Sequence, residues 1–188
     1  MIELVYPLDP APLIGPEADA SETVPVVDEN GLVIGRAARD YCHSGGNVVL
    51  HPVVHLQIID RYSRFFLQHR SSNKETFPGR WDTAVGGHVA YGEYYEEALF
   101  REAGEELGLY DFNPQYLDNY IADQPGDKEM VGLYVTVGAF DLHPDNYEVS
   151  EGRYWTTDEI EASLGKDIFT PEFENEFQTY KDRILALL

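Results

Sequence analysis

The feature of this chain that most directly suggests chemistry is the spacing of four glutamates, Glu93, Glu102, Glu105 and Glu106. Helix positions three and four apart share a face, so the last three carboxylates are expected to crowd into one turn. Such carboxylates raise each other's pKa unless a cation lies between them. Mg²⁺ prefers oxygen ligands and usually completes its shell with water and substrate phosphates. The pattern therefore predicts a site for Mg²⁺ or Mn²⁺ that acts on a diphosphate.

These glutamates belong to a longer motif with fixed spacing. It runs from Gly87 to Leu109 and reads Gly-x5-Glu-x7-Arg-Glu-U-x-Glu-Glu-x-Gly-U, where U is an apolar residue. The segment resembles the Nudix box at every fixed position, which is a far more specific signal than a lone glycine motif. The alternative, an ordinary solvated acidic helix, does not account for glycines in the same register at both ends. The resemblance implies these metal ligands: the carboxylates of Glu102, Glu105 and Glu106, and the carbonyl of Gly87.

The resemblance also implies roles for individual side chains. Glu102 is our first choice for the general base, and we group Glu105 with it as catalytic. Arg101 is expected to orient the carboxylates through a salt bridge, and Glu93 to support the loop before the helix. Glu129, at the start of a later strand, is either a further carboxylate of the site or a charge at a loop edge.

Upstream segments resemble the branch of Nudix proteins related to isopentenyl diphosphate isomerase. The segments Val27–Gly31, Val33–Gly35, Leu50–His51 and Phe77–Trp81 carry this similarity. The isomerase needs a catalytic cysteine where this chain has Gly86, and glycine cannot transfer a proton to or from carbon. Since every box glutamate is kept, hydrolysis is favoured over isomerisation.

Histidines raise the prospect of a second metal. His43, His51 and His88 lie near the positions that bind one in the isomerase, although the spacing of the first pair differs, and His55 is close by. The alternative is that His51 and His55 are strand residues with satisfied side chains and that His43 is on the surface. The spacing matches no zinc pattern.

Composition narrows the possible partners. The 188 residues carry a formal charge of -21, which disfavours duplex nucleic acid or an anionic membrane as a partner. No apolar run approaches the ~20 residues of a membrane span, and we read no signal peptide. Cys42 is the single cysteine, so an intrachain disulfide is excluded and a cytoplasmic location is the default expectation.

Periodicity predicts the elements that would position the motif. Apolar residues spaced by four, from Tyr95 to Leu107, predict a helix that begins near Tyr94, with Gly108 as its C-terminal cap. Asn30-Gly31 predicts a hairpin turn. Thr157 or Asp158 is expected to cap a small helix, and a C-terminal helix is expected over 173–187. The predicted strands are 24–27, 32–35, 51–59, 64–69, 81–85, 115–122, 129–140 and 152–155.

Together these elements predict an α/β (α+β) protein. We expect a Nudix-type α/β/α sandwich with a mixed central sheet, formed by residues 23–188 after an irregular, proline-containing arm over 1–22. The predicted function is metal-dependent cleavage of a phosphoanhydride bond in a nucleoside diphosphate linked to another group. No further organic cofactor is expected, and a homodimer is compatible with the family. The isomerase and a non-catalytic nucleotide-binding Nudix module remain the alternatives.

Overall fold

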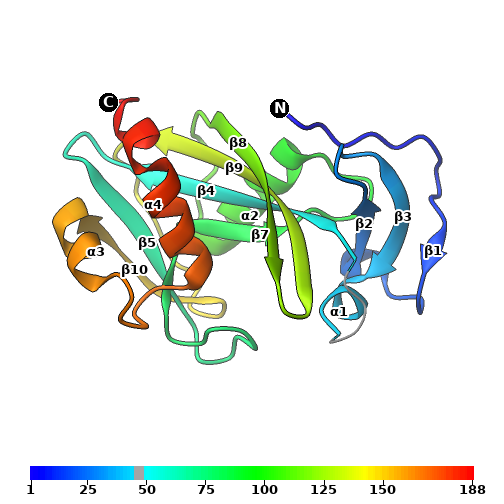
Figure 1. Ribbon diagram of the computed structural model, residues 1–188. Helices are drawn as coiled ribbons and strands as arrows, with labels where there is room; N and C mark the ends of the chain where they lie inside the picture. The colour runs from blue at the N-terminus through cyan, green and yellow to red at the C-terminus, as the bar shows by residue number, and fades with distance from the viewer. Residues whose placement is uncertain (45–48) are drawn as a thin grey trace. The chain divides into compact units, whose positions relative to one another are not determined.

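The computed structural model describes residues 1–44 and 49–188 (Figure 1). Its strands form a three-stranded sheet in the order β1-β3-β2 and a seven-stranded sheet in the order β10-β5-β4-β9-β8, with β6 on β5 and β7 on β4. The strands of the first sheet are β1 Leu13–Ile14, β2 Thr23–Val27 and β3 Val33–Ala38. Those of the second are β4 His51–Ile59, β5 Arg64–Arg70, β6 Trp81–Asp82, β7 Val85–His88, β8 Gln115–Gln124, β9 Asp127–Val137 and β10 Val149–Thr156. The helices are α1 Arg39–Cys42, α2 Tyr95–Leu107, α3 Thr157–Ser163 and α4 Pro171–Leu185, besides a 3₁₀ turn over Ala20–Glu22.

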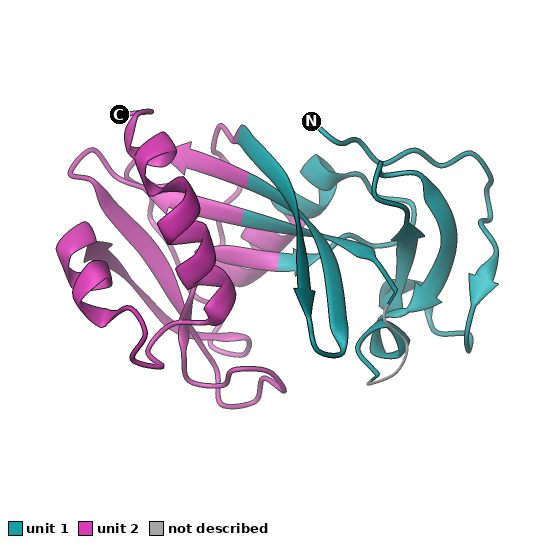
Figure 2. Cartoon of the chain, in the orientation of Figure 1, with its two compact units in different colours: residues 1–55, 87–99, 116–133 teal, residues 56–86, 100–115, 134–188 magenta. Residues whose placement is uncertain are grey.

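The chain divides into two compact units, each built from three stretches (Figure 2). Unit 1 contains residues 1–55, 87–99 and 116–133, and unit 2 contains 56–86, 100–115 and 134–188. The N-terminal arm falls wholly within unit 1. Our division of the chain at residue 22 stays a prediction.

Unit 1 contains the hairpin that Asn30-Gly31 predicts. The Asp28 carboxylate accepts backbone hydrogen bonds from Asn30 and Leu32, and Gly31 takes a φ of 84° that suits glycine. Strands β2 and β3 pair antiparallel across this turn, and β1 from the arm adds to β3 in parallel. The arm therefore contributes a strand to the fold.

Unit 2 shows the helix, sheet and helix layers of a sandwich. Phe65 on β5 packs against Phe177 on α4, with ring centroids 5.4 Å apart. Gln68, three residues after Phe65 on β5, donates a hydrogen bond to Glu106 of α2. Because side chains alternate between faces along a strand, the two helical segments cover opposite faces of the unit 2 part of the sheet. The predicted fold class is confirmed.

Two predicted details need correction. The single strand expected over 81–85 is two short strands, because β6 pairs with β5 whereas β7 pairs with β4. Between them the Asp82 carboxylate, rather than a neighbouring strand, accepts the Thr83 N–H. The cap of α3 is Thr156, one residue earlier than expected, in a reciprocal capping box with Glu159. Helix α2 begins at Tyr95, which agrees with the predicted start near Tyr94.

Two further observations concern the helices. Gly108 ends α2 as predicted, with a φ of 62° and its N–H donating to the Gly104 carbonyl. Among the described residues, no helix combines the length and the apolar character that crossing a bilayer requires.

Candidate active site

Glu106 is the most deeply buried of the box glutamates. Only 4% of the residue is exposed. Its Oε2 accepts hydrogen bonds from Gln68 Nε2 at 3.0 Å and from the Gly86 N–H at 3.3 Å. Burial, and then the nearby Glu102 carboxylate, raise the pKa of Glu106 well above its usual value. An anion in this position is costly to the protein unless a cation joins it.

Arg101 pairs with the other two glutamates of the helix. Its Nη1 lies 2.7 Å from Glu102 Oε1 and 3.4 Å from Glu105 Oε2, which is the ion pair that the resemblance implies. The Glu102 side chain is 14% exposed and that of Glu105 is 61% exposed. Burial raises the pKa of Glu102, although the Arg101 guanidinium opposes this effect. Of the three box carboxylates on this helix, that of Glu106 is buried, that of Glu102 is partly buried and that of Glu105 reaches solvent.

Two loops bring charged side chains near these glutamates: the first follows β5 and the second precedes β10. Lys74 forms an ion pair with Glu148, and the Glu148 carbonyl accepts the Ser71 N–H at 3.1 Å. The Asp145 N–H donates to the Glu106 carbonyl at 3.0 Å, which ties the second loop to the end of the helix. The Lys74 ammonium lowers the pKa of Glu106, and the Glu148 carboxylate raises it, both less than burial does.

Glu93 and Gly87 belong to unit 1. The Glu93 Oε2 accepts the Ala90 N–H at 2.9 Å, so this side chain braces the loop before α2 as expected. Tyr6 from the arm braces the same loop, since its hydroxyl donates to the Glu93 carbonyl at 2.8 Å and accepts the Gly92 N–H at 3.0 Å. Burial raises the pKa of Tyr6 to about 12. Gly87 lies in β7.

A separate cluster of metal-ligating groups also lies in unit 1. One ligand atom from each of His43, His51, His88 and Glu129 falls within 4.8 Å of all the others. Within residues 1–44 and 49–188 no second such group of three or more is found, so the box glutamates do not gather in this way. This cluster brings together Glu129 and His88, which the sequence suggested as supporting residues. His55 does not belong to the cluster.

His51 has the donor geometry of a metal ligand. Its Nδ1 lies 3.0 Å from the Val49 carbonyl, which fixes the proton on that nitrogen. Its Nε2 is buried and has no hydrogen-bond partner among the described residues. The Nε2 atoms of His43 and His88 face each other at 2.8 Å. Burial lowers the pKa of His51, which favours the neutral form that binds metals.

Asp127 lies beside this cluster. Its Oδ1 is 3.2 Å from His43 Nδ1 and 3.9 Å from His51 Nε2. Asp127 is not among the predicted site residues, although it stands two residues before Glu129 and so shares its face of β9. That spacing is the signal in the sequence that could have identified it.

The comparisons with known proteins decide the family. A family model described as the NUDIX domain matches residues 49–173. The chain belongs to the NUDIX family. An uncharacterized Nudix hydrolase from Streptomyces coelicolor is 32% identical over 157 residues, which is 82% of this chain and 86% of the relative. An isopentenyl-diphosphate Delta-isomerase from Mycolicibacterium vanbaalenii is 30% identical over 145 residues, 72% of this chain and 78% of the relative.

Solved structures agree on the Nudix fold. The crystal structure of a Deinococcus radiodurans protein superposes with a TM-score of 0.71 at 22% identity, covering 87% of this chain and 99% of that one. The NUDIX domain of Shewanella oneidensis NrtR, solved with ADP-ribose, gives a TM-score of 0.58 at 15% identity, covering 73% and 88%. The relatives include proteins named Nudix hydrolases and proteins named isopentenyl-diphosphate isomerases, which is consistent with the predicted relationship to the isomerase branch.

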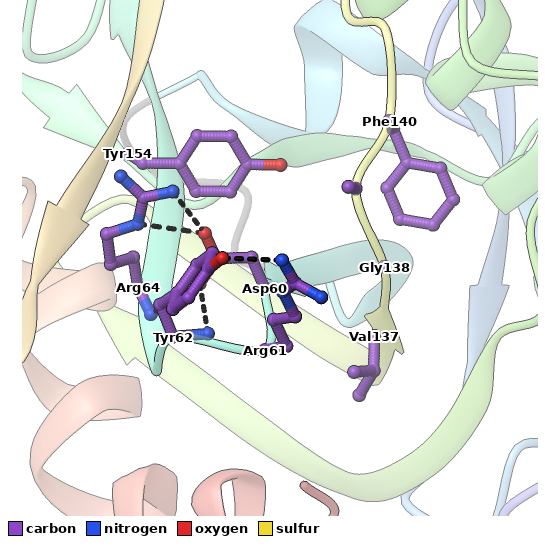
Figure 3. Close-up of a pocket in the computed structure, with 9 residues that line it drawn as sticks. Asp60, Arg61, Tyr62, Arg64, Val137, Gly138, Phe140 and Tyr154 are labelled. Carbon is purple, nitrogen blue, oxygen red and sulfur yellow. Dashed lines mark hydrogen bonds and ion pairs between the residues drawn. The ribbon is translucent and has the colours of Figure 1, made fainter.

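This Nudix protein also has a cavity away from the box. It measures about 530 Å³ and lies in unit 2, where Tyr62, Phe140 and Tyr154 contribute aromatic rings to its wall (Figure 3). Arg64 makes two hydrogen bonds to one carboxylate oxygen of Asp60, at 2.8 and 2.6 Å. None of the box residues lines this cavity, so we assign it no part in the chemistry of the box.

Proposed function

We propose that this Nudix protein is a divalent-metal-dependent hydrolase that cleaves a phosphoanhydride bond in a nucleoside diphosphate linked to another group. The observation that carries the proposal is the buried carboxylate of Glu106 on the box helix near the partly buried carboxylate of Glu102, with burial raising the pKa of both. A carboxylate is rarely buried near another one, because its desolvation is costly. A cation between them and a substrate diphosphate accounts for the arrangement.

The donor set of the box fits a hard cation. Oxygen atoms are the ligands that Mg²⁺ and Mn²⁺ prefer, and we assign this role to the carboxylates of Glu102, Glu105 and Glu106. When bound, the cation would neutralise the diphosphate and lower the pKa of a water molecule. Glu102 would take the proton from that water, since a raised pKa suits a general base. Arg101 would hold Glu102 and Glu105 in place.

A second divalent cation fits the histidine cluster. Imidazole nitrogens and a carboxylate are good ligands for Mn²⁺ and the later transition metals. The support for this assignment is the buried His51 Nε2, which has no hydrogen-bond partner among the described residues. The Val49 carbonyl holds the ring in the orientation and tautomer that a metal requires.

Isomerase activity is the second candidate, favoured by relatives that carry that name. Gly86 provides no thiol, and its N–H donates to Glu106. A Nudix module that binds nucleotides without cleaving them is the third, and the complete set of box glutamates disfavours it.

A panel of substrates separates these candidates. We would incubate the protein with ADP-ribose, NADH, a nucleotide sugar, a dinucleoside polyphosphate, coenzyme A, a deoxynucleoside triphosphate and isopentenyl diphosphate, with Mg²⁺, with Mn²⁺ and with EDTA. The proposal predicts metal-dependent release of a nucleotide or phosphate from at least one diphosphate derivative and loss of that release in Glu105→Gln. Conversion of isopentenyl diphosphate alone supports the isomerase, and binding without turnover supports the module.

A further inference from the structure

Gln68 is a buried polar side chain outside the box that touches a box glutamate. It lies on β5 and is 3% exposed. Its Nε2 donates to Glu106 Oε2 at 3.0 Å and to the Ala84 carbonyl at 3.1 Å. These two hydrogen bonds account for both protons of the amide, so the orientation of the side chain is fixed.

The contact is made to one particular oxygen of Glu106. Oε2 accepts from Gln68 and from the Gly86 N–H, whereas Oε1 accepts no hydrogen bond from the described residues. Two donors on the same oxygen prevent the carboxylate from rotating. Oε1 therefore remains available to a cation.

We propose that Gln68 is a positioning residue for the metal site: it holds Oε2 of Glu106 so that Oε1 is presented to the divalent cation. This inference rests on the proposed function. Gln68 contacts neither the substrate nor the reacting atoms in this arrangement, and it acts through Glu106 alone. Partners of metal-ligating carboxylates commonly change metal affinity 10–100-fold when they are removed.

The protein offers a matched control on the neighbouring strand. Gln57 of β4 is 1% exposed, and its Nε2 donates to the buried Glu176 of α4 at 2.6 Å. The register of β4 and β5 pairs Ile59 with Phe65, so Gln57 faces the same side as Phe65 and the side opposite to Gln68. Gln57→Met and Gln68→Met thus remove the same kind of buried glutamine–glutamate contact, and only the second one involves the box.

The test compares Mn²⁺ binding by these two variants. Electron paramagnetic resonance measures free Mn²⁺ during titration of the wild-type protein, Gln68→Met, Gln57→Met and Glu106→Gln, and turnover is measured as a function of metal concentration. We expect Gln68→Met to weaken, by about 10–100-fold, the same class of bound Mn²⁺ that Glu106→Gln weakens. The metal concentration for half-maximal turnover should rise by a similar factor. We expect Gln57→Met to bind Mn²⁺ as tightly as the wild type does.

Several outcomes would overturn the inference. Equal Mn²⁺ affinity in Gln68→Met and the wild type refutes it while leaving the proposed function intact. Equal weakening in both methionine variants assigns Gln68 a merely structural role. A wild-type protein that binds no Mn²⁺ and turns over no diphosphate refutes the proposed function together with the inference. If Gln68→Met does not fold, Gln68→Asn, whose amide is too short for the same contact, should show the same weakening.

Discussion

Replacing Glu106 by Gln should stabilise the metal-free protein while it removes activity. The carboxylate is 4% exposed, and burial together with Glu102 raises its pKa well above the usual value. The folded state therefore holds a proton at Glu106 at pH values where the unfolded chain has lost it. Stability falls as pH rises from the unfolded pKa through the raised folded pKa. The neutral amide of Glu106→Gln would avoid this cost.

The size of the effect follows from the same linkage. Each unit by which the pKa is raised corresponds to about 1.4 kcal/mol above the folded pKa. For a chain of this length, each kcal/mol shifts Tm by about 2–4 °C. We therefore expect Glu106→Gln to melt about 3–6 °C higher for every unit of the pKa shift at pH 8, and to show a smaller gain at pH 5, which lies only just above the unfolded pKa.

The assay is thermal unfolding by calorimetry in EDTA at pH 5 and pH 8, with Mg²⁺-dependent turnover measured on the same samples. A metal ligand contributes several kcal/mol to transition-state stabilisation, and about 1.4 kcal/mol is worth tenfold, so we expect at least about a 100-fold loss of kcat. A lower Tm than the wild type at pH 8, or a gain of equal size at both pH values, would refute the reasoning.

Three further predictions concern other parts of the protein. Thr156→Ala removes the cap of α3 and should cost about 1 kcal/mol in guanidinium unfolding; no change in the midpoint would contradict the cap. Tyr6→Phe removes two hydrogen bonds to the loop before α2 and should cost about 1–3 kcal/mol in the same assay, whereas Tyr110→Phe, at a residue 76% exposed, should cost nothing measurable. His51→Ala should abolish one class of bound Mn²⁺ in electron paramagnetic resonance and retain the class that Glu106→Gln weakens; an unchanged stoichiometry would show that the histidine cluster holds no Mn²⁺.

Local sequence patterns predicted the elements whose formation depends on residues close together in the sequence. The spacing by four of Tyr95, Leu99, Ala103 and Leu107 predicted α2, and all four residues are at most 4% exposed. The hairpin at Asn30-Gly31 and the strands over 51–59 and 64–69 were predicted for the same reason.

The errors have physical causes that the sequence partly reveals. Residues 156–158 all have side chains that suit a helix cap, and both Thr156 and Asp158 have a glutamate three positions later, so the sequence alone does not identify the true cap. The strand over 81–85 was divided because the chain changes its pairing partner between Asp82 and Val85, and pairing is a tertiary property. The spacing of apolar residues along the sequence does not reveal which strand a segment pairs with.

The contacts of the site were the least predictable part. Gln68 and Glu106 are 38 residues apart, and Tyr6 and Gly92 are 86 apart. Neither Gln68 nor Tyr6 belongs to the motif, so only folding identifies them. The histidines were considered as metal ligands, but their convergence with Glu129 depends on three strands and a helix coming together.

The most direct test of the central claim is the fate of water oxygen during turnover. The fastest substrate of the panel would be incubated in water labelled with oxygen-18, with Mg²⁺ or with EDTA, and the phosphate products examined by mass spectrometry. Metal-dependent hydrolysis predicts one labelled oxygen in one phosphate product for each bond cleaved, only with metal, and almost none in the same time with Glu105→Gln. Unlabelled products, or labelling that persists in EDTA or in Glu105→Gln, would contradict the claim that the box glutamates hold a metal for hydrolysis.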